Sequence, residues 1–182
     1  MRIGIDIDDT ITNTIETMDN YASIYDSSIT IRKDKYRIPD RYNWDQYKCE
    51  DFLKNYMEQI ISNVSLKEDA VKYINKLHDE GNTIYFITAR SDKYSPNVPN
   101  ITLDYLKNIG IKYDSIITHS RFKDKECIDN NIDIMIDDSP RHAIECVKAG
   151  INFIIMDNDY NKDIDALRGH NWEEIYEIIK RS

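Results

Sequence analysis

The stretch Arg2-Ile3-Gly4-Ile5-Asp6-Ile7-Asp8-Asp9-Thr10 opens the chain and decides how the rest of the sequence is interpreted. Isoleucine and glycine dominate its first half, and aspartates take over from Asp6 onward. Isoleucine favours strands, whereas clustered aspartates favour loops and turns. We therefore predict a short buried strand that ends in an acidic loop, followed by a helix over 11–25.

From residue 83 onward, strand-like and helix-like segments alternate. Short apolar runs predict strands at residues 83–87, 115–117, 132–136 and 152–156. Helical periodicity predicts helices between and after these strands, at 101–108, 125–130, 140–149 and 172–180. Strands that alternate with helices form a parallel sheet with helices on both faces. The predicted fold class is therefore α/β, with a doubly wound parallel sheet.

Residues 14–66 interrupt this alternation, because no strand is predicted within them. The segment 27–43 is polar and irregular in pattern, whereas 44–62 carries apolar residues at helical spacing. A further helix is predicted at 65–80, where Gly81 provides a C-terminal cap. The predicted organisation is a core of residues 1–13 and 67–182 with a small helical insertion, residues 14–66, after the first strand.

Composition excludes several classes of protein. The 182 residues carry 33 acidic and 24 basic side chains, a formal net charge of −9. Such a chain lacks the broad basic face that grips a nucleic-acid backbone, so no nucleic-acid partner is expected. No apolar run approaches the ~20 residues of a membrane span, and the early carboxylates argue against a signal peptide. Three cysteines without a Cys-x-x-Cys pair argue against a disulfide framework or a zinc site and favour a reducing cytoplasm; they are Cys49, Cys127 and Cys146.

Polar side chains gather at the predicted strand ends. In an open parallel sheet, ligands bind at the carboxyl ends of the strands. Four segments there are polar in a coordinated way: Asp6-Ile7-Asp8-Asp9-Thr10, Thr88-Ala89-Arg90, Lys123-Asp124-Lys125 and Asp137-Asp138-Ser139. Each is weak evidence alone, but together and in this order they predict a single site.

The residue types at these ends indicate phosphoryl transfer. Carboxylates from Asp6, Asp8 and the Asp137-Asp138 pair would repel one another unless a cation lay among them. Oxygen ligands without histidine or cysteine favour Mg²⁺. A threonine hydroxyl, a lysine ammonium group and backbone N–H groups suit phosphate oxygens. We therefore expect Mg²⁺ as cofactor and a small phosphorylated molecule as substrate.

This pattern resembles the haloacid-dehalogenase superfamily of phosphohydrolases. The corresponding motifs here would be Ile5–Ile11, Ile84–Thr88, Lys125 and Ile134–Asp138. An insertion directly after the first motif resembles the type with a small helical C1 cap. The Thr88-Ala89-Arg90 turn and the stretch Ile132–Pro140 are similar to the 5'(3')-deoxyribonucleotidase branch and its bacterial relatives.

The resemblance implies roles for individual residues. Asp6 would be the nucleophile that forms an aspartyl-phosphate, and Asp8 would be the general acid and base. Asp6, the backbone carbonyl of Asp8, and Asp138 would bind Mg²⁺, with Asp137 behind these ligands. Thr88, Ala89 and Lys125 would bind the phosphate. Lys123 competes with Lys125 for this role, and we favour Lys125 because it lies nearer the start of the helix around Cys127-Ile128.

Other polar and aromatic residues have weaker assignments. Arg90 could contact a phosphate or a sugar, or it could pair with Asp92 or a cap carboxylate. His119 and His142 are interpreted as structural, because no second ligand accompanies either. The insertion is rich in aromatic residues, most of which would build its core, but Trp44 is a candidate for stacking on a base. Tyr160 and Trp172 are expected in the core.

The sequence therefore favours a Mg²⁺-dependent phosphomonoesterase acting on a small metabolite, with a (deoxy)nucleoside monophosphate as the first choice. A carboxylate at position 8 argues against a dehalogenase and against a P-type ATPase. Three alternatives remain open. They are a sugar-phosphate phosphotransferase or mutase, a phosphatase of macromolecular ends or phosphoproteins, and a catalytically idle nucleotide-binding module.

Overall fold

The computed structural model describes residues 1–181, which form a six-stranded parallel sheet with the strand order β3-β2-β1-β4-β5-β6. The strands are β1 (Arg2–Ile5), β2 (Thr83–Ile87), β3 (Ser115–Ile117), β4 (Ile134–Asp137), β5 (Asn152–Met156) and β6 (Leu167–Gly169). The chain runs outward from β1 to β3, then returns to place β4 on the other side of β1. The sheet therefore reverses its winding between β1 and β4, where α/β proteins bind their ligands.

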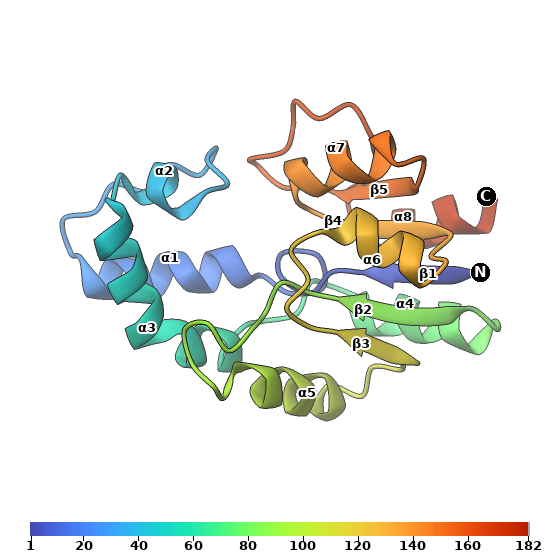
Figure 1. Cartoon of the computed structure of the whole chain (residues 1–182), viewed down its shortest axis with the longest axis horizontal. Coiled ribbons are helices and arrows are strands. Elements are labelled where there is room, and N and C mark those ends of the chain that lie inside the picture. Colours follow the sequence, from blue (N-terminus) through green and yellow to red (C-terminus); the bar gives the residue numbers. More distant parts are fainter. Residues whose placement is uncertain (182) are drawn as a thin grey trace.

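Helices cover both faces of this sheet, which confirms the predicted doubly wound α/β class (Figure 1). One face packs against α4 (Ala70–Asp79), α5 (Val98–Asn108) and α8 (Trp172–Arg181). The opposite face packs against α6 (Lys123–Asp129) and α7 (Pro140–Lys148). Successive strand residues point to opposite faces, so Ile134 and Ile136 join the first core and Met135 joins the second.

Gly4 lies at the centre of the sheet because no side chain fits there. A Cβ atom on this residue would lie 2.7 Å from the sulfur of Met135 and 3.2 Å from a methyl group of Ile87. The glycine leaves room for the side chains of Met135 and Ile87 on the neighbouring strands, and it precedes the acidic loop by one residue. A larger residue at this position would displace the strand that carries the loop.

Helices α1 (Thr14–Tyr25), α2 (Ile38–Tyr42) and α3 (Gln46–Ser62) lie together beyond the carboxyl ends of the strands (Figure 1). They share an apolar cluster of their own, built largely from aromatic rings. An isolated bridge between Thr12 and Leu66 joins the two connections to this helical layer. We keep the division into a core of residues 1–13 and 67–182 and a cap of residues 14–66 as a proposal.

Differences from the sequence-based expectation are local. Strand β6 and helix α2 were not predicted, because each is only a few residues long and carries no clear periodicity. The helix expected at 65–80 begins at Ala70, since Asp69 adopts a left-handed conformation with φ of 59°. Trp172 is fully buried, as expected, and its indole nitrogen donates to the carbonyl oxygen of Thr10 at 3.1 Å. Within residues 1–181, no helix combines the length and the apolar character needed to cross a membrane.

Candidate active site

Three buried carboxylates meet where β1 and β4 end. Asp6 directly follows β1, Asp137 is the last residue of β4, and Asp138 follows it. One carboxylate oxygen from each lies within 4.8 Å of the others. The amide of Asp6 donates to the carbonyl oxygen of Ile136 at 2.9 Å, which extends the pairing of the two strands into the site. Strand pairing itself therefore brings these residues together.

The acidic cluster is electrostatically unfavourable without a cation. Burial raises the pKa of Asp6 to about 7, and the charges of Asp137 and Asp8 act in the same direction, against the lowering effect of Lys123. Burial and the charge of Asp137 also raise the pKa of Asp138 well above its ordinary value. Oxygen ligands that are buried, close together and mutually repulsive fit a hard divalent cation. The residues present therefore fit the metal that the sequence predicts.

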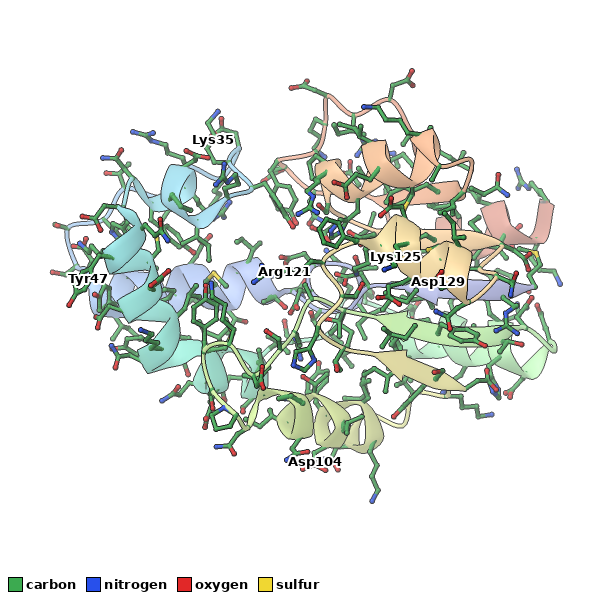
Figure 2. The ribbon with its side chains drawn as sticks, in the orientation of Figure 1. Lys35, Tyr47, Asp104, Arg121, Lys125 and Asp129 are labelled. Atoms are coloured by element: carbon green, nitrogen blue, oxygen red, sulfur yellow. The ribbon has the colours of Figure 1, made fainter. Side chains whose placement is uncertain are left out.

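Lys123, not Lys125, is the lysine of this site. The Lys123 side chain is 1% exposed, and its ammonium group donates to Asp6 and to the carbonyl oxygen of Ile87. Lys125 lies on the exposed side of α6 (Figure 2). The choice of Lys125 was wrong because α6 begins at Lys123, two residues before the predicted start. Residues two apart on a helix face different directions, so only one of the two lysines can enter the site.

Asp8 is held from two sides. The guanidinium group of Arg90 donates to both carboxylate oxygens, and the closest contact is 2.7 Å from Nη2 to Oδ1. The hydroxyl of Thr14, the first residue of α1, donates to the same Oδ1 at 2.7 Å. Burial would raise the pKa of Asp8, but the charge and hydrogen bonds of Arg90 outweigh it and lower the pKa. Arg90 thus pairs with a carboxylate, but the partner is Asp8, which is neither Asp92 nor a carboxylate of the cap.

Thr88 and Ala89 follow β2 at the same edge of the sheet. Thr88 is fully buried, its amide donates to the carbonyl oxygen of Ile117 at 2.9 Å, and its hydroxyl accepts from the amide of Arg90 at 3.2 Å. Ala89 lies beside Arg90 in the lining of the neighbouring cavity. The structure therefore brings the turn after β2 to the edge of the sheet where Asp6 and Asp8 lie.

Two residues interpreted as structural contact the acidic cluster. His142 Nδ1 lies 2.9 Å from Asp137 Oδ2, and Lys123 and His142 together lower the pKa of Asp137 against the effect of its burial. The hydroxyl of Tyr160 donates to Asp138 Oδ2 at 2.5 Å. For His142 a signal was present, because it lies five residues after Asp137 in the first turn of a helix with a serine cap. Tyr160 lies in an irregular segment, where nothing in the sequence indicated its direction.

Trp44 does not face the site. It is buried in the cluster of α1, α2 and α3, with ring centroids 5.4 Å from Tyr25 and 5.2 Å from Phe52. Its indole nitrogen donates to Asp26 Oδ2 at 3.2 Å. The prediction that Trp44 stacks on a base is therefore wrong, since its ring faces are already covered by the core of the helical layer.

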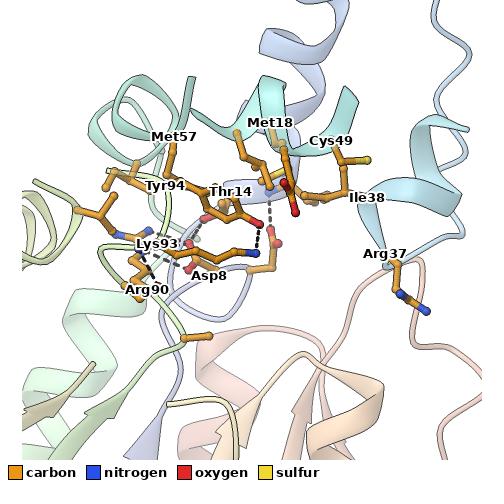
Figure 3. Close-up of a pocket in the computed structure, with 18 of the residues that line it drawn as sticks. Asp8, Thr14, Met18, Arg37, Ile38, Cys49, Met57, Arg90, Lys93 and Tyr94 are labelled. Atoms are coloured by element: carbon orange, nitrogen blue, oxygen red, sulfur yellow. Dashed lines mark hydrogen bonds and ion pairs between the residues drawn. The ribbon is translucent and has the colours of Figure 1, made fainter. Parts of the chain in front are cut away.

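A cavity of about 510 Å³ separates the helical layer from Asp8 and Arg90 (Figure 3). Its walls are mainly apolar and come from α1, α2, α3 and the start of α5; they include Met18, Ile38, Leu53, Met57 and Val98. Gln46 and Glu50, one turn apart on α3, and Lys93 add polar groups. A small molecule bound there would present one end to Asp8 and bury an apolar body against the helices.

The cluster combines a buried carboxylate next to a buried ammonium group, a second carboxylate with an exposed face, and a place for a cation. Such a set can attack phosphorus, stabilise the charge that develops on phosphate oxygens and exchange a proton with a leaving group. His119, the other histidine considered, lies 3.1 Å from exposed Asp92 and outside this cluster.

Known proteins with similar sequences are described as nucleotidases. A family model described as "5' nucleotidase, deoxy (Pyrimidine), cytosolic type C protein" matches residues 1–182. The chain is 32% identical to a nucleotidase of Clostridium acetobutylicum, with 100% of this chain and 94% of that protein covered. It is 25% identical to a "Putative 5'(3')-deoxyribonucleotidase" of Chlorobaculum tepidum, with coverage of 98% and 89%.

The fold is also that of a solved hydrolase. A haloacid-dehalogenase-like hydrolase from Streptococcus pneumoniae superposes with a TM-score of 0.71 at 14% identity, covering 98% of this chain and 97% of that one. At this level of identity the likeness concerns the fold, and it places the doubly wound sheet and its helical layer among haloacid-dehalogenase-like structures.

Proposed function

We propose that this chain, which belongs to the 5' nucleotidase, deoxy (pyrimidine), cytosolic type C family, releases inorganic phosphate from a (deoxy)nucleoside monophosphate. Membership in this family makes it a phosphoric monoester hydrolase of the haloacid-dehalogenase superfamily. The proposal adds the substrate, the residues that act on it, an aspartyl-phosphate intermediate and Mg²⁺.

One observation carries the proposal: Asp6 and Asp8 follow the same strand, two residues apart, yet they pair with different cations and differ in exposure. Asp6 contacts the buried ammonium group of Lys123, whereas Asp8 pairs with Arg90 and keeps a side chain that is 33% exposed. Paired carboxylates in different environments can take different roles in one reaction. This difference supports Asp6 as the nucleophile and Asp8 as the residue that exchanges protons.

In the first step, a carboxylate oxygen of Asp6 attacks phosphorus, and the bond from phosphorus to the ester oxygen breaks. The ester oxygen leaves with the bonding electron pair and takes a proton from Asp8. The products are an aspartyl-phosphate on Asp6 and a free alcohol. Lys123 and the turn of Thr88 and Ala89 stabilise the negative charge on the phosphate oxygens.

In the second step, Asp8 has become a carboxylate and takes a proton from water while that water attacks phosphorus. The bond from phosphorus to Asp6 breaks, the carboxylate of Asp6 is regenerated, and inorganic phosphate is released. Asp8 ends the cycle protonated, as it began. The same residue thus serves as acid and then as base, which requires that it stay fixed between the two steps.

Asp6, Asp138 and the backbone carbonyl of Asp8 would hold Mg²⁺, with Asp137 oriented behind them by His142 and Lys123. When bound, the cation would supply positive charge that draws a phosphate oxygen toward Asp6 and offsets the repulsion between the carboxylates. Lys123 contacts Asp6 and Asp137, yet the pKa values of Asp6 and Asp138 stay raised, which supports a further cation at this cluster over a structural role.

The cavity above Asp8 supports a nucleoside as the leaving group. A nucleoside pairs a flat, largely apolar base with a few polar edges, and the cavity pairs apolar walls with Gln46 and Glu50. Helices α1, α2 and α3 line the cavity and limit its size, which favours small substrates over macromolecular ends.

The experiment is phosphate release from a panel of phosphomonoesters by the purified chain, with Mg²⁺ and then with EDTA. The panel contains 5'- and 3'-nucleotides with ribose or deoxyribose, sugar phosphates and a phosphopeptide, and Asp6→Asn serves as the blank. Metal-dependent release that is greatest on deoxynucleotides and absent in Asp6→Asn supports the proposal. An isomeric product without free phosphate indicates a mutase, and nucleotide binding without turnover indicates a binding module.

A further inference from the structure

We infer that Arg90 is a positioning residue that acts through Asp8, and that it leaves Oδ2 of Asp8 as the oxygen that exchanges the proton. The inference rests on the proposed function, in which Asp8 is the general acid and base. It assigns to Arg90 no contact with the phosphate, the sugar or the base.

The hydrogen bonds that Arg90 makes within the protein occupy the nitrogens that could otherwise donate to a substrate. Nε donates to Asp8 at 3.1 Å, Nη2 donates to Asp8 at 2.7 Å, and Nη1 donates to the hydroxyl of Thr102 at 3.4 Å. All three nitrogens thus have protein acceptors, and the side chain is only 3% exposed. A residue that bound substrate would need an exposed donor directed into the cavity. The guanidinium group is instead fixed between α5 and the acidic loop.

The bracing of Arg90 continues beyond its own side chain. Thr102 is fully buried in α5, and its hydroxyl donates to the carbonyl oxygen of Val98 at 2.8 Å. The amide of Arg90 donates to the hydroxyl of Thr88 at 3.2 Å. The arginine is therefore anchored at its backbone by the turn after β2 and at its tip by a helix. A planar, anchored fork of donors fixes the plane of the carboxylate that it binds.

The two oxygens of Asp8 are not equivalent. Oδ1 accepts from Nη2 at 2.7 Å, from Nε at 3.2 Å and from the hydroxyl of Thr14 at 2.7 Å. Oδ2 accepts from Nε at 3.1 Å. A protonated carboxyl still accepts hydrogen bonds at its carbonyl oxygen, so the contacts to Oδ1 are compatible with both states of Asp8. Oδ2 accepts fewer hydrogen bonds than Oδ1, so we assign Oδ2 as the oxygen that exchanges the proton with the ester oxygen.

This arrangement makes a specific kinetic prediction, because an acid matters only when the leaving group needs a proton. The alkoxide of a nucleoside is a poor leaving group, whereas p-nitrophenolate departs without protonation. If Arg90 positions the acid, its loss slows the first step for thymidine 5'-monophosphate but not for p-nitrophenyl phosphate. The quantity to compare is kcat/KM, which reports the first step, since the base role of Asp8 in the second step is common to both substrates.

The test measures kcat/KM of Arg90→Met, Arg90→Lys and Thr102→Val with these two substrates. For Arg90→Met we expect a loss on the order of 100-fold with thymidine 5'-monophosphate and less than about threefold with p-nitrophenyl phosphate. Arg90→Lys keeps the charge without the planar set of donors, and Thr102→Val removes the acceptor of Nη1 together with the hydrogen bond from Thr102 to Val98. Both variants are expected to lose kcat/KM with thymidine 5'-monophosphate but not with p-nitrophenyl phosphate, and to lose less than Arg90→Met. Both can be measured in its place if circular dichroism shows that Arg90→Met does not fold.

A double-mutant cycle completes the test. In an Asp8→Asn background, Arg90→Met is expected to cause almost no further loss, because it acts through a carboxylate that is already gone. Equal losses with both substrates, together with weaker inhibition by inorganic phosphate, would show that Arg90 binds the phosphate and overturn the inference. A wild-type chain that releases phosphate from neither substrate would instead overturn the proposed function.

Discussion

The Nζ atom of Lys123 lies 3.1 Å from Oδ2 of Asp137, although the two side chains come from different elements of the core, α6 and β4. Both side chains are almost fully buried, and the same ammonium group also contacts Asp6. Asp6 and Asp137 together raise the pKa of Lys123 despite its burial, so the lysine stays charged. A charged, buried lysine that touches the proposed nucleophile is the cation already present to meet a phosphate.

Removal of this charge should abolish turnover without loss of the fold. We expect Lys123→Met to lower kcat/KM for a deoxynucleotide by at least about 100-fold, because one stabilising donor to a developing negative charge contributes about 10²–10³ in rate. The measurement is phosphate release at saturating Mg²⁺, with circular dichroism to confirm folding. Lys125→Met, on the exposed side of the same helix, is the matched control and should retain wild-type activity. A larger loss of kcat/KM in Lys125→Met than in Lys123→Met would show that Lys125 is the lysine of the site.

Mg²⁺ should stabilise the folded chain, because it relieves the repulsion among Asp6, Asp137 and Asp138. A cation at 100 times its Kd adds about 2.7 kcal/mol of stability, and each kcal/mol raises the Tm of a chain this size by roughly 2–4 °C. We therefore expect a rise in Tm of roughly 5–10 °C with Mg²⁺ over EDTA, measured by differential scanning fluorimetry. In Asp138→Asn the rise should shrink sharply. An identical Tm with and without metal, together with full activity in EDTA, would contradict a cation site.

Much of the fold could be predicted because the sequence alternates cleanly. Strands such as 83–87 and 152–156 are buried on both faces, so they are nearly continuous apolar runs with polar ends, and the structure confirms both ranges. Leu167–Gly169 escaped prediction because it is a three-residue edge strand, whose place depends on pairing with β5 rather than on its own residues. Pairing between residues far apart in the chain leaves no recognisable pattern in the sequence of the strand itself.

Some residues of the candidate site could likewise be predicted from the sequence, and others could not. The positions of Asp6, Asp137 and Asp138 follow from the strands that end beside them, and the structure brings these carboxylates together as expected. The lysine could not be chosen from sequence, because a shift of two residues in the start of α6 exchanges the buried face for the exposed one. Trp44 could not be placed either, since an aromatic ring suits the core of a small helical layer as well as it suits a ligand.

His142 should matter for activity although it touches no reacting atom. Its ring contacts Asp137, so its loss should let that carboxylate rotate, and groups that orient metal ligands typically contribute 10–100-fold. We expect His142→Ala to raise the Mg²⁺ concentration for half-maximal activity by about 10-fold or more. His119→Asn is a suitable control, because His119 is exposed and has a φ of 63° that asparagine tolerates. An unchanged Mg²⁺ dependence in His142→Ala would assign the histidine to packing alone.

Trp44 should affect stability rather than substrate binding. It is 6% exposed within the aromatic cluster of the helical layer, and truncation of such a residue typically costs about 3–5 kcal/mol. We expect Trp44→Ala to lower the free energy of unfolding by that amount in urea titrations, whereas Tyr47→Ala, at an 82% exposed position, should change it by less than about 0.5 kcal/mol. Below the Tm, the KM of Trp44→Phe for nucleotides should match the wild type. A raised KM in a stable Trp44→Phe variant would restore the stacking role.

The cavity above Asp8 should select substrates by size, and Met57 is the residue that tests this. It lines the cavity from α3 and is partly buried against the aromatic cluster, so a larger side chain there would project into the space proposed for the nucleoside. We expect Met57→Trp to raise the KM for thymidine 5'-monophosphate by about 10-fold or more, since overpacking a site typically costs about 1–3 kcal/mol. The same variant should hydrolyse acetyl phosphate, whose leaving group is small, at close to the wild-type rate. Met57→Leu conserves volume and should leave both substrates unaffected. Equal effects of Met57→Trp on both substrates would mean that the leaving group binds outside this cavity.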